Sequence, residues 1–206
     1  MVLAVVLVAL GAALAVEEGG LAVVAEALVV VALRGAGNVK KNWRRILAHA
    51  FISKKDVARH FPPDALGKIE KVIDISEKAH LAELLCVVEG GWDLRSLLKG
   101  QTPRERALAW FGQSRLWDTE ENSGVLIYLS LPDRQVEIIA DRGIVRKVPE
   151  MTWQNICQSM VILLQQGRSV EALEKGLELV GKVLQGAFAR GDVPYCNQFP
   201  NQVWIV

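Results

Sequence analysis

Apolar runs separated by turn signals predict the strands of this chain. Leu84–Val88 is a continuous apolar run that is too short for a helix, so it predicts a buried central strand. Two further runs, Gly124–Leu131 and Arg134–Ala140, flank Pro132-Asp133, where proline fixes φ for a turn. These two runs predict a β-hairpin. Its first strand is nearly all apolar, which is typical of a strand covered on both faces.

Helical spacing of apolar residues marks the segments around these strands. A short helix is expected from an N-cap at Ser53 to His60, and a longer one from near Asp64 to His80. Thr102-Pro103-Arg104-Glu105 combines a capping box with proline at the first helical position, so it predicts a helix start. Apolar residues three or four positions apart predict the buried stripes of three helices: Leu66, Ile69 and Ile73; Trp153, Ile156, Met160 and Leu163; Val170, Leu173, Leu177, Val180 and Leu184.

The order of these elements predicts the α/β class, with a mixed β-sheet sandwiched between helices (α/β/α) in a single domain. A chain of 206 residues that is 51% hydrophobic can bury one full core. We expect a leader over residues 1–38, the α/β domain over 42–190 and a tail over 191–206. The tail is expected to be irregular or to end in an edge strand at Val203–Val206.

The leader differs in composition from the rest of the chain. From Val2 to Gly37 every residue is Val, Leu, Ala, Gly or Glu, apart from Arg34. Its apolar run, Val2–Val16, is shorter than the roughly 20 residues that cross a bilayer, and no basic residue precedes it as in a signal peptide. Two interpretations stay open. The leader is an anchor with the domain on the cytoplasmic side, as the basic residues after it indicate, or an extension outside the native coding sequence. The expected localisation is cytoplasmic, either free or membrane-anchored.

Charge and motifs exclude several classes of function. The net charge is +1, with 24 basic and 23 acidic residues, so no large basic field favours nucleic acid. No glycine-rich phosphate loop is present, so we expect no nucleotide, and no G-x-S-x-G hydrolase motif is present. The histidines have no close metal spacing, and the cysteines have no C-x-x-C pair and are expected to be reduced thiols. These residues are His49, His60 and His80, and Cys86, Cys157 and Cys196.

One segment, residues 118–124, has metal-ligand chemistry. Asp118, Glu120 and Asn122 place side-chain oxygens at alternate positions, as loops that bind a hard cation such as calcium do, and Glu121 adds a further carboxylate. The segment is not an EF-hand, because its glycine falls one place late and the twelfth position is Leu129.

Additional ligands must therefore come from elsewhere. Asp141 is expected to supply one, because a hairpin brings Gly124 close to Ala140. Asp133, at the turn end of the hairpin, is expected to lie out of reach. The alternative is a solvated acidic loop whose side chains only cap turns, which is the more frequent case.

Three arginine side chains near the same segment also have two interpretations. Arg115, Arg142 and Arg146 either neutralise the acidic loop or bind a phosphate or carboxylate group. Trp117 either stacks on a ligand or packs in the core.

The segment Arg115–Leu129 and the following Asp133–Ile144 resemble the TPM domain family. The most specific pieces are Asn122-x-Gly124-Val-Leu and Asp141-x-Gly143. The likeness runs from about Asn42 to residues 197–201, and it is greatest to bacterial members encoded beside a LemA-type protein. Members of this type begin near Asn42, which favours the extension as the interpretation of the leader.

The resemblance implies a mixed sheet flanked by helices, with an acidic site at the head of the hairpin that binds calcium or another divalent cation in some members. It implies Asp118, Glu120, Glu121, Asn122 and Asp141 as candidate metal or phosphate-site residues and Arg142 as an anion partner, beside Arg115. A plant relative of the thylakoid lumen is linked to acid phosphatase activity. We therefore expect a non-catalytic binding or assembly module with a membrane-associated, LemA-type partner, or alternatively a metal-assisted acid phosphatase.

Overall fold

The computed structural model describes residues 39–52, 54–195 and 198–206. The leader over residues 1–38, the predicted N-cap Ser53 and Cys196 lie outside these residues. The helices are α3 (Val39–Phe51), α4 (Lys54–His60), α5 (Pro63–Glu77), α6 (Leu94–Leu98), α7 (Pro103–Gln113), α8 (Arg142–Val145), α9 (Glu150–Gln165) and α10 (Ser169–Ala187). The strands are β1 (Glu83–Glu89), β2 (Gly124–Ser130), β3 (Gln135–Ala140) and β4 (Val203–Ile205).

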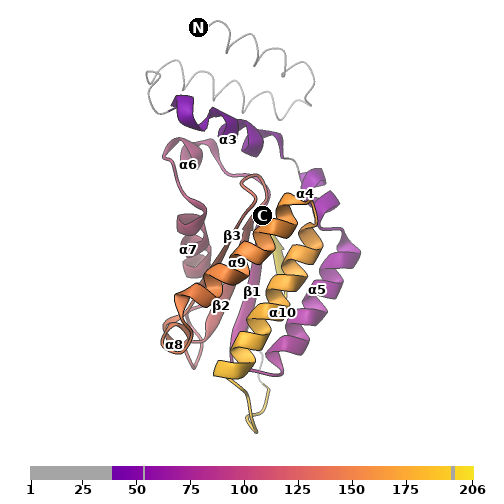
Figure 1. Ribbon diagram of the computed structural model, residues 1–206, viewed down its shortest axis with the longest axis vertical. Coiled ribbons are helices and arrows are strands. Elements are labelled where there is room, and N and C mark those ends of the chain that lie inside the picture. Colours follow the sequence, from indigo (N-terminus) through magenta and orange to yellow (C-terminus); the bar gives the residue numbers. More distant parts are fainter. Residues whose placement is uncertain (1–38, 53, 196–197) are drawn as a thin grey trace, which may run out of the picture. The chain divides into compact units, whose positions relative to one another are not determined.

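The chain divides into two compact units. The smaller unit contains α3 and α6, and the larger one spans residues 54–90 and 102–206. All four strands belong to the larger unit and form one sheet in the order β3-β2-β1-β4 (Figure 1). β1 is parallel to both β2 and β4, whereas β2 and β3 form the predicted antiparallel hairpin. The tail therefore contributes an edge strand, as one of the two expectations for it stated.

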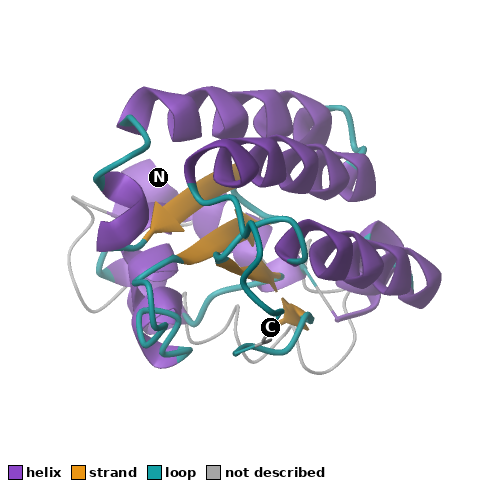
Figure 2. Cartoon of the chain, turned by 90° about the horizontal axis from the view of Figure 1, so that it is seen from below, coloured by secondary structure: helices purple, strands orange, loops and turns teal. Residues whose placement is uncertain are grey.

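Helices cover both faces of this sheet. α9 and α10 run side by side and α5 lies along α10, on one face (Figures 1 and 2). α7 packs on the other face, where its Arg106 reaches Glu89. Consecutive residues of a strand point to opposite faces, so strands between two helical layers are buried on both. Every residue of β1 and β2 is buried, and the predicted α/β/α class is confirmed.

The local signals explain where the long helices begin and which side they bury. At the start of α7, the Thr102 hydroxyl accepts from Glu105 N at 3.2 Å and the Glu105 carboxylate accepts from Thr102 N at 2.8 Å, so the predicted capping box is present. In α5, Ile69 and Ile73 are buried as predicted. In α9 the buried residue of the last turn is Leu164, not the predicted Leu163, because the helix buries a slightly rotated stripe.

The sequence patterns did not predict two short helices. α6 and α8 have five and four residues, which is too short for an apolar period to repeat. Both begin at an aspartate N-cap, Asp93 and Asp141. Among the helices in the part of the chain that the structure describes, none combines the length and apolarity needed to span a membrane.

Candidate functional site

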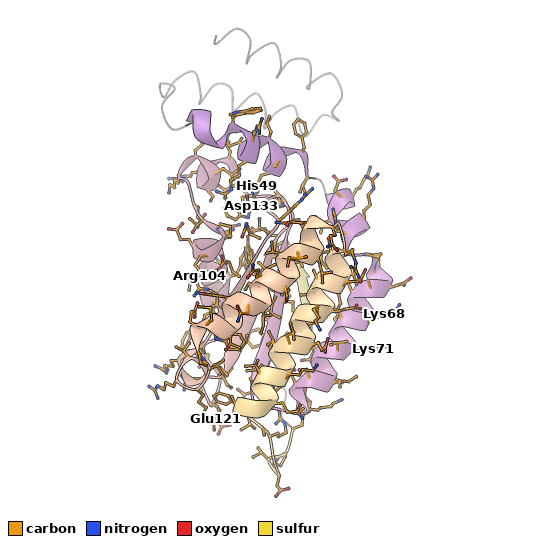
Figure 3. All side chains as sticks on the ribbon, viewed as in Figure 1. His49, Lys68, Lys71, Arg104, Glu121 and Asp133 are labelled. Carbon is orange, nitrogen blue, oxygen red and sulfur yellow. The ribbon has the colours of Figure 1, made fainter. Side chains whose placement is uncertain are left out.

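One end of the sheet gathers the predicted site residues. β1, β2 and β4 begin at this end and β3 ends there, and we call it the amino edge. Glu83, the first residue of β1, pairs with Gly124, and Val125 pairs with Ala140, the last residue of β3. The Asp141 N–H donates to Gly124 O at 2.9 Å, so the hairpin brings these residues together as predicted. Asp133 lies at the opposite end of the hairpin from Glu121 (Figure 3).

The acidic loop is packed directly onto the start of α8. The Gly143 N–H donates to Asn122 O at 3.0 Å, and Asn122 has a φ of 50°, a backbone conformation that asparagine tolerates. A Cβ at position 143 would lie 2.5 Å from Glu121 O and 2.6 Å from Asn122 O. Glycine is therefore required at this position, where two peptide oxygens face the first turn of α8.

Side chains reinforce the same junction. The Arg142 Nε donates to Asn122 Oδ1 at 2.6 Å. The Asp141 carboxylate caps α8, since its Oδ1 accepts from Arg142 N at 2.6 Å. The other oxygen, Asp141 Oδ2, is buried and has no hydrogen-bond partner among the described residues. A buried carboxylate oxygen without a donor is costly, and a water molecule, a proton or a cation would compensate it.

The remaining predicted residues lie on the outer side of the loop. The side chains of Arg115, Asp118, Glu120 and Glu121 are exposed. The backbone N–H of Asp118 donates to Arg115 O at 2.8 Å, and that of Glu120 donates to Gln198 Oε1 at 3.3 Å. The structure thus joins Asn122, Asp141 and Arg142 through direct contacts. Among the described residues, no group of three or more His, Cys, Asp or Glu side chains is arranged to hold a metal ion.

The sequence patterns missed a buried polar cluster at the same edge. Glu77, His80 and Glu83 are all buried. Glu77 Oε1 accepts from Leu84 N at 2.7 Å, across the connection between α5 and β1. His80 Nε2 shares a hydrogen bond of 3.0 Å with Ser76 Oγ. Glu83 Oε2 has no hydrogen-bond partner in the described part of the chain.

Burial shifts the ionisation of all three groups. It raises the pKa of Glu77 to about 8, because desolvation outweighs the Leu84 hydrogen bond and neighbouring Glu83 adds repulsion. Burial also raises the pKa of Glu83 and lowers that of His80 to about 4. Clusters of shifted groups are more frequent at functional sites than elsewhere. In the sequence, Glu83 is an acidic residue directly before the apolar run Leu84–Val88, whereas no local pattern marks Glu77 or His80 as buried.

The tail crosses this cluster and connects it to the acidic loop. The Gln198 N–H donates to Glu83 Oε1 at 3.3 Å, while its side-chain oxygen accepts from the loop at Glu120. Asn201 Nδ2 donates to Asp74 Oδ1 at 3.3 Å. Arg190, just after α10, donates from Nη2 to the backbone oxygens of Glu77 and His80 at 2.7 and 2.6 Å. The loop and the buried carboxylates therefore belong to one hydrogen-bonded region.

The donor set at the loop fits a hard divalent cation. Calcium prefers carboxylate and peptide oxygens and completes its coordination with water. Asp141 Oδ2 is a buried oxygen without a hydrogen-bond partner among the described residues, and the peptide oxygens of Glu121 and Asn122 lie close to the Gly143 backbone, two residues further along the chain. These residues would hold such an ion.

Comparisons with known proteins agree with the fold. The structure is similar to the NMR structure of the BA42 protein from the psychrophilic bacterium Bizionia argentinensis, with a TM-score of 0.61 and 22% sequence identity. The match covers 69% of this chain and 93% of that chain, and at this identity it shows the fold. A search of curated proteins finds no match. The family model described as the TPM domain matches residues 55–183, more than half of the chain. The chain therefore belongs to the TPM domain family.

Proposed function

We propose that this protein is a non-catalytic binding and assembly module whose acidic loop takes a divalent cation such as calcium at the amino edge. The observation that carries the proposal is Asp141 Oδ2, a buried carboxylate oxygen without a partner in the described chain. By resemblance to bacterial family members, the module acts with a membrane-associated partner of the LemA type.

The contacts of the loop support a binding role. An ion between Asp141 and the peptide oxygens of Glu121 and Asn122 would tie the loop to the start of α8. The exposed carboxylates of Asp118, Glu120 and Glu121 add negative charge beside it, which favours cations through the local field. The ion would thereby stabilise the surface that the loop presents to a partner.

Calcium titration of the thermal unfolding temperature tests the ion. Ligand that binds only the folded state stabilises it by about 2.7 kcal/mol at 100 times its Kd. Calcium should therefore raise the Tm of the wild-type protein. Asp141→Asn should abolish this rise, because asparagine keeps the N-cap of α8 but loses the charge. Asp118→Ala, which removes an exposed carboxylate, should reduce the rise.

Asp133→Asn is the matched control, since Asp133 lies at the other end of the hairpin and accepts from Ser130 Oγ at 3.1 Å. It should leave the calcium-dependent rise unchanged. An equal rise in wild type and Asp141→Asn, or no rise at millimolar calcium, contradicts the proposed cation site.

A metal-assisted acid phosphatase is the second candidate, favoured by the position of Arg142. Its side chain is exposed and held next to Asp141 through its Nε bond to Asn122, so its terminal nitrogens can face a phosphate group. Arg115, also exposed, would supply a second cation. In this case the ion would polarise the phosphoryl oxygens.

Hydrolysis of p-nitrophenyl phosphate in the presence of calcium or magnesium distinguishes the two functions. A phosphatase should lose about 100-fold or more in kcat/KM with Arg142→Ala, as expected when a charge-stabilising donor is removed. Activity that survives both Arg142→Ala and Asp141→Asn would come from a contaminant. A calcium-dependent Tm without turnover supports the binding module alone.

A further inference from the structure

Helix α3, in the smaller unit, has one packed face. Ile46 and His49 are buried. The Trp92 N–H donates to His49 Nδ1 at 3.2 Å, and the Arg45 guanidinium lies 4.4 Å from the centroid of the Trp92 ring. Arg45 Nη1 also donates to Gln101 O at 2.8 Å. These contacts fix the rotation of α3 about its own axis.

The other face of α3 presents an apolar row. Trp43, Leu47 and Phe51 are spaced at i, i+4 and i+8, which places them along one side of a helix. Trp43 is 45% exposed and Phe51 39% exposed, and Leu47 between them is half-buried. The exposed Arg44 lies beside the row, with its guanidinium 5.5 Å from the centroid of the Trp43 ring.

The sequence around this row has a strong local charge. Residues 27–55 contain seven Lys and Arg residues and no Asp or Glu, although the whole chain has a net charge of only +1. The rest of the chain therefore carries a net charge of −6. The seven residues are Arg34, Lys40, Lys41, Arg44, Arg45, Lys54 and Lys55. Such a segregated positive charge attracts an anionic surface.

Aromatic and aliphatic side chains on one side of a basic helix are typical of helices that lie in a membrane interface. A nucleic acid would use the cations but would leave the apolar row in water, whereas lipid accommodates both. We propose that the exposed face of α3 docks on an anionic phospholipid membrane. Trp43, Leu47 and Phe51 enter the boundary between headgroups and acyl chains, and Arg44 pairs with lipid phosphate. This surface is independent of the cation site.

Vesicle binding by the full chain tests the electrostatic contribution to the proposed membrane docking. The protein should bind vesicles of phosphatidylcholine with 30% phosphatidylglycerol more tightly than pure phosphatidylcholine vesicles, and less tightly in 0.5 M NaCl. Arg44→Glu should lower the affinity about 30-fold, because each basic residue near the surface contributes about fivefold. Lys71→Glu, at an exposed cation of α5, changes the net charge equally and should have less than a threefold effect (Figure 3). Equal losses in the two variants overturn the proposal.

Fluorescence quenching by vesicles that contain brominated lipid tests the contact itself. Trp43→Phe should remove the quenched component of the emission. Trp117→Phe should keep that component, because Trp117 is similarly exposed, at 49%, but lies in the acidic-loop region. Three outcomes would overturn the proposal: quenching that is unchanged in Trp43→Phe, a Trp43 shielded from aqueous iodide before vesicles are added, or tighter binding to a single-stranded oligonucleotide than to vesicles.

Discussion

Two buried glutamates at the opposite ends of β1 have contrasting surroundings. Glu89, which is 2% exposed, accepts hydrogen bonds from three side chains. Arg106 Nε lies 2.9 and 3.0 Å from its two oxygens, the Tyr128 hydroxyl donates at 2.6 Å and Trp110 Nε1 at 3.3 Å. Glu83, which is 3% exposed, accepts from Gln198 N at 3.3 Å and from the Phe199 backbone, and keeps one oxygen without a partner in the described chain.

This difference distinguishes a carboxylate with a structural role from one that still has an oxygen to bind a ligand. Every oxygen of Glu89 is compensated, so this residue ties α7 to the sheet and has little capacity for a ligand. The amino edge instead leaves two buried carboxylate oxygens uncompensated, on Glu83 and Asp141. Proteins retain such groups at the cost of stability where function needs them.

The largest effect is expected from removing Glu89. Glu89→Leu removes the buried carboxylate that accepts from Arg106 Nε and the Tyr128 hydroxyl, so it should lower the free energy of unfolding by about 3–5 kcal/mol. Glu83→Leu removes a poorly compensated carboxylate and should change it by less than about 1 kcal/mol. Urea denaturation of both variants measures the difference. Equal losses would show that the two ends of β1 are energetically alike.

A second test uses pH and depends on Glu77. Its pKa is raised from 4.5 to about 8, so it contributes stability that is fully present below pH 4.5 and is lost as the pH rises towards 8. The pKa of His80 is lowered from 6.5 to about 4, so it contributes stability that is present above pH 6.5 and is lost as the pH falls towards 4. The two effects oppose each other between pH 4.5 and 6.5.

Above pH 6.5 the His80 contribution is complete, so it no longer opposes the Glu77 effect between pH 6.5 and 8. The free energy of unfolding should fall there by up to about 1.4 kcal/mol for each pH unit. Glu77→Gln keeps an oxygen to accept from Leu84 N and should remove most of this slope. Denaturation midpoints across this range check the prediction, and a slope that is unchanged in the variant contradicts it.

The smallest effects compare two tyrosine hydroxyls. Tyr128→Phe removes a short bond to the Glu89 carboxylate and should cost about 1.5 kcal/mol. Tyr195→Phe removes two long contacts of its hydroxyl, at 3.5 Å with Glu77 and at 3.4 Å with Asn201, and should cost less than about 0.5 kcal/mol. Thermal unfolding of the two variants distinguishes these values. A larger loss for Tyr195→Phe would show that the tail is bound more tightly than its long contacts indicate.

The parts of the fold that local patterns encode were predicted from the sequence. The hairpin follows from two apolar runs and a turn pair, and the start of α7 follows from a capping box between residues three positions apart. The position of Asp141 beside Gly124 also follows, because antiparallel pairing dictates it.

The polar cluster was not predictable in this way. Its contacts join residues far apart in the chain, such as Gln198 with Glu83 and Arg190 with Glu77, and no period in the sequence reports them. The shifted pKa values depend on burial by the completed fold. The closure of the loop on Gly143 depends on the local approach of two backbones, which the residue types alone do not specify.

The pairing of β4 with β1 has a consequence for folding kinetics. Cys86, Val87 and Val88 pair with Val203, Trp204 and Ile205, so this side of the central strand forms contacts of very high sequence separation. Such contacts form slowly, because a long loop must close before they stabilise anything. During synthesis on the ribosome, β1 can pair with β2 well before residues 203–205 emerge. Until then, its other edge is a template for unwanted strand addition, which would make the last step of folding the one most exposed to aggregation.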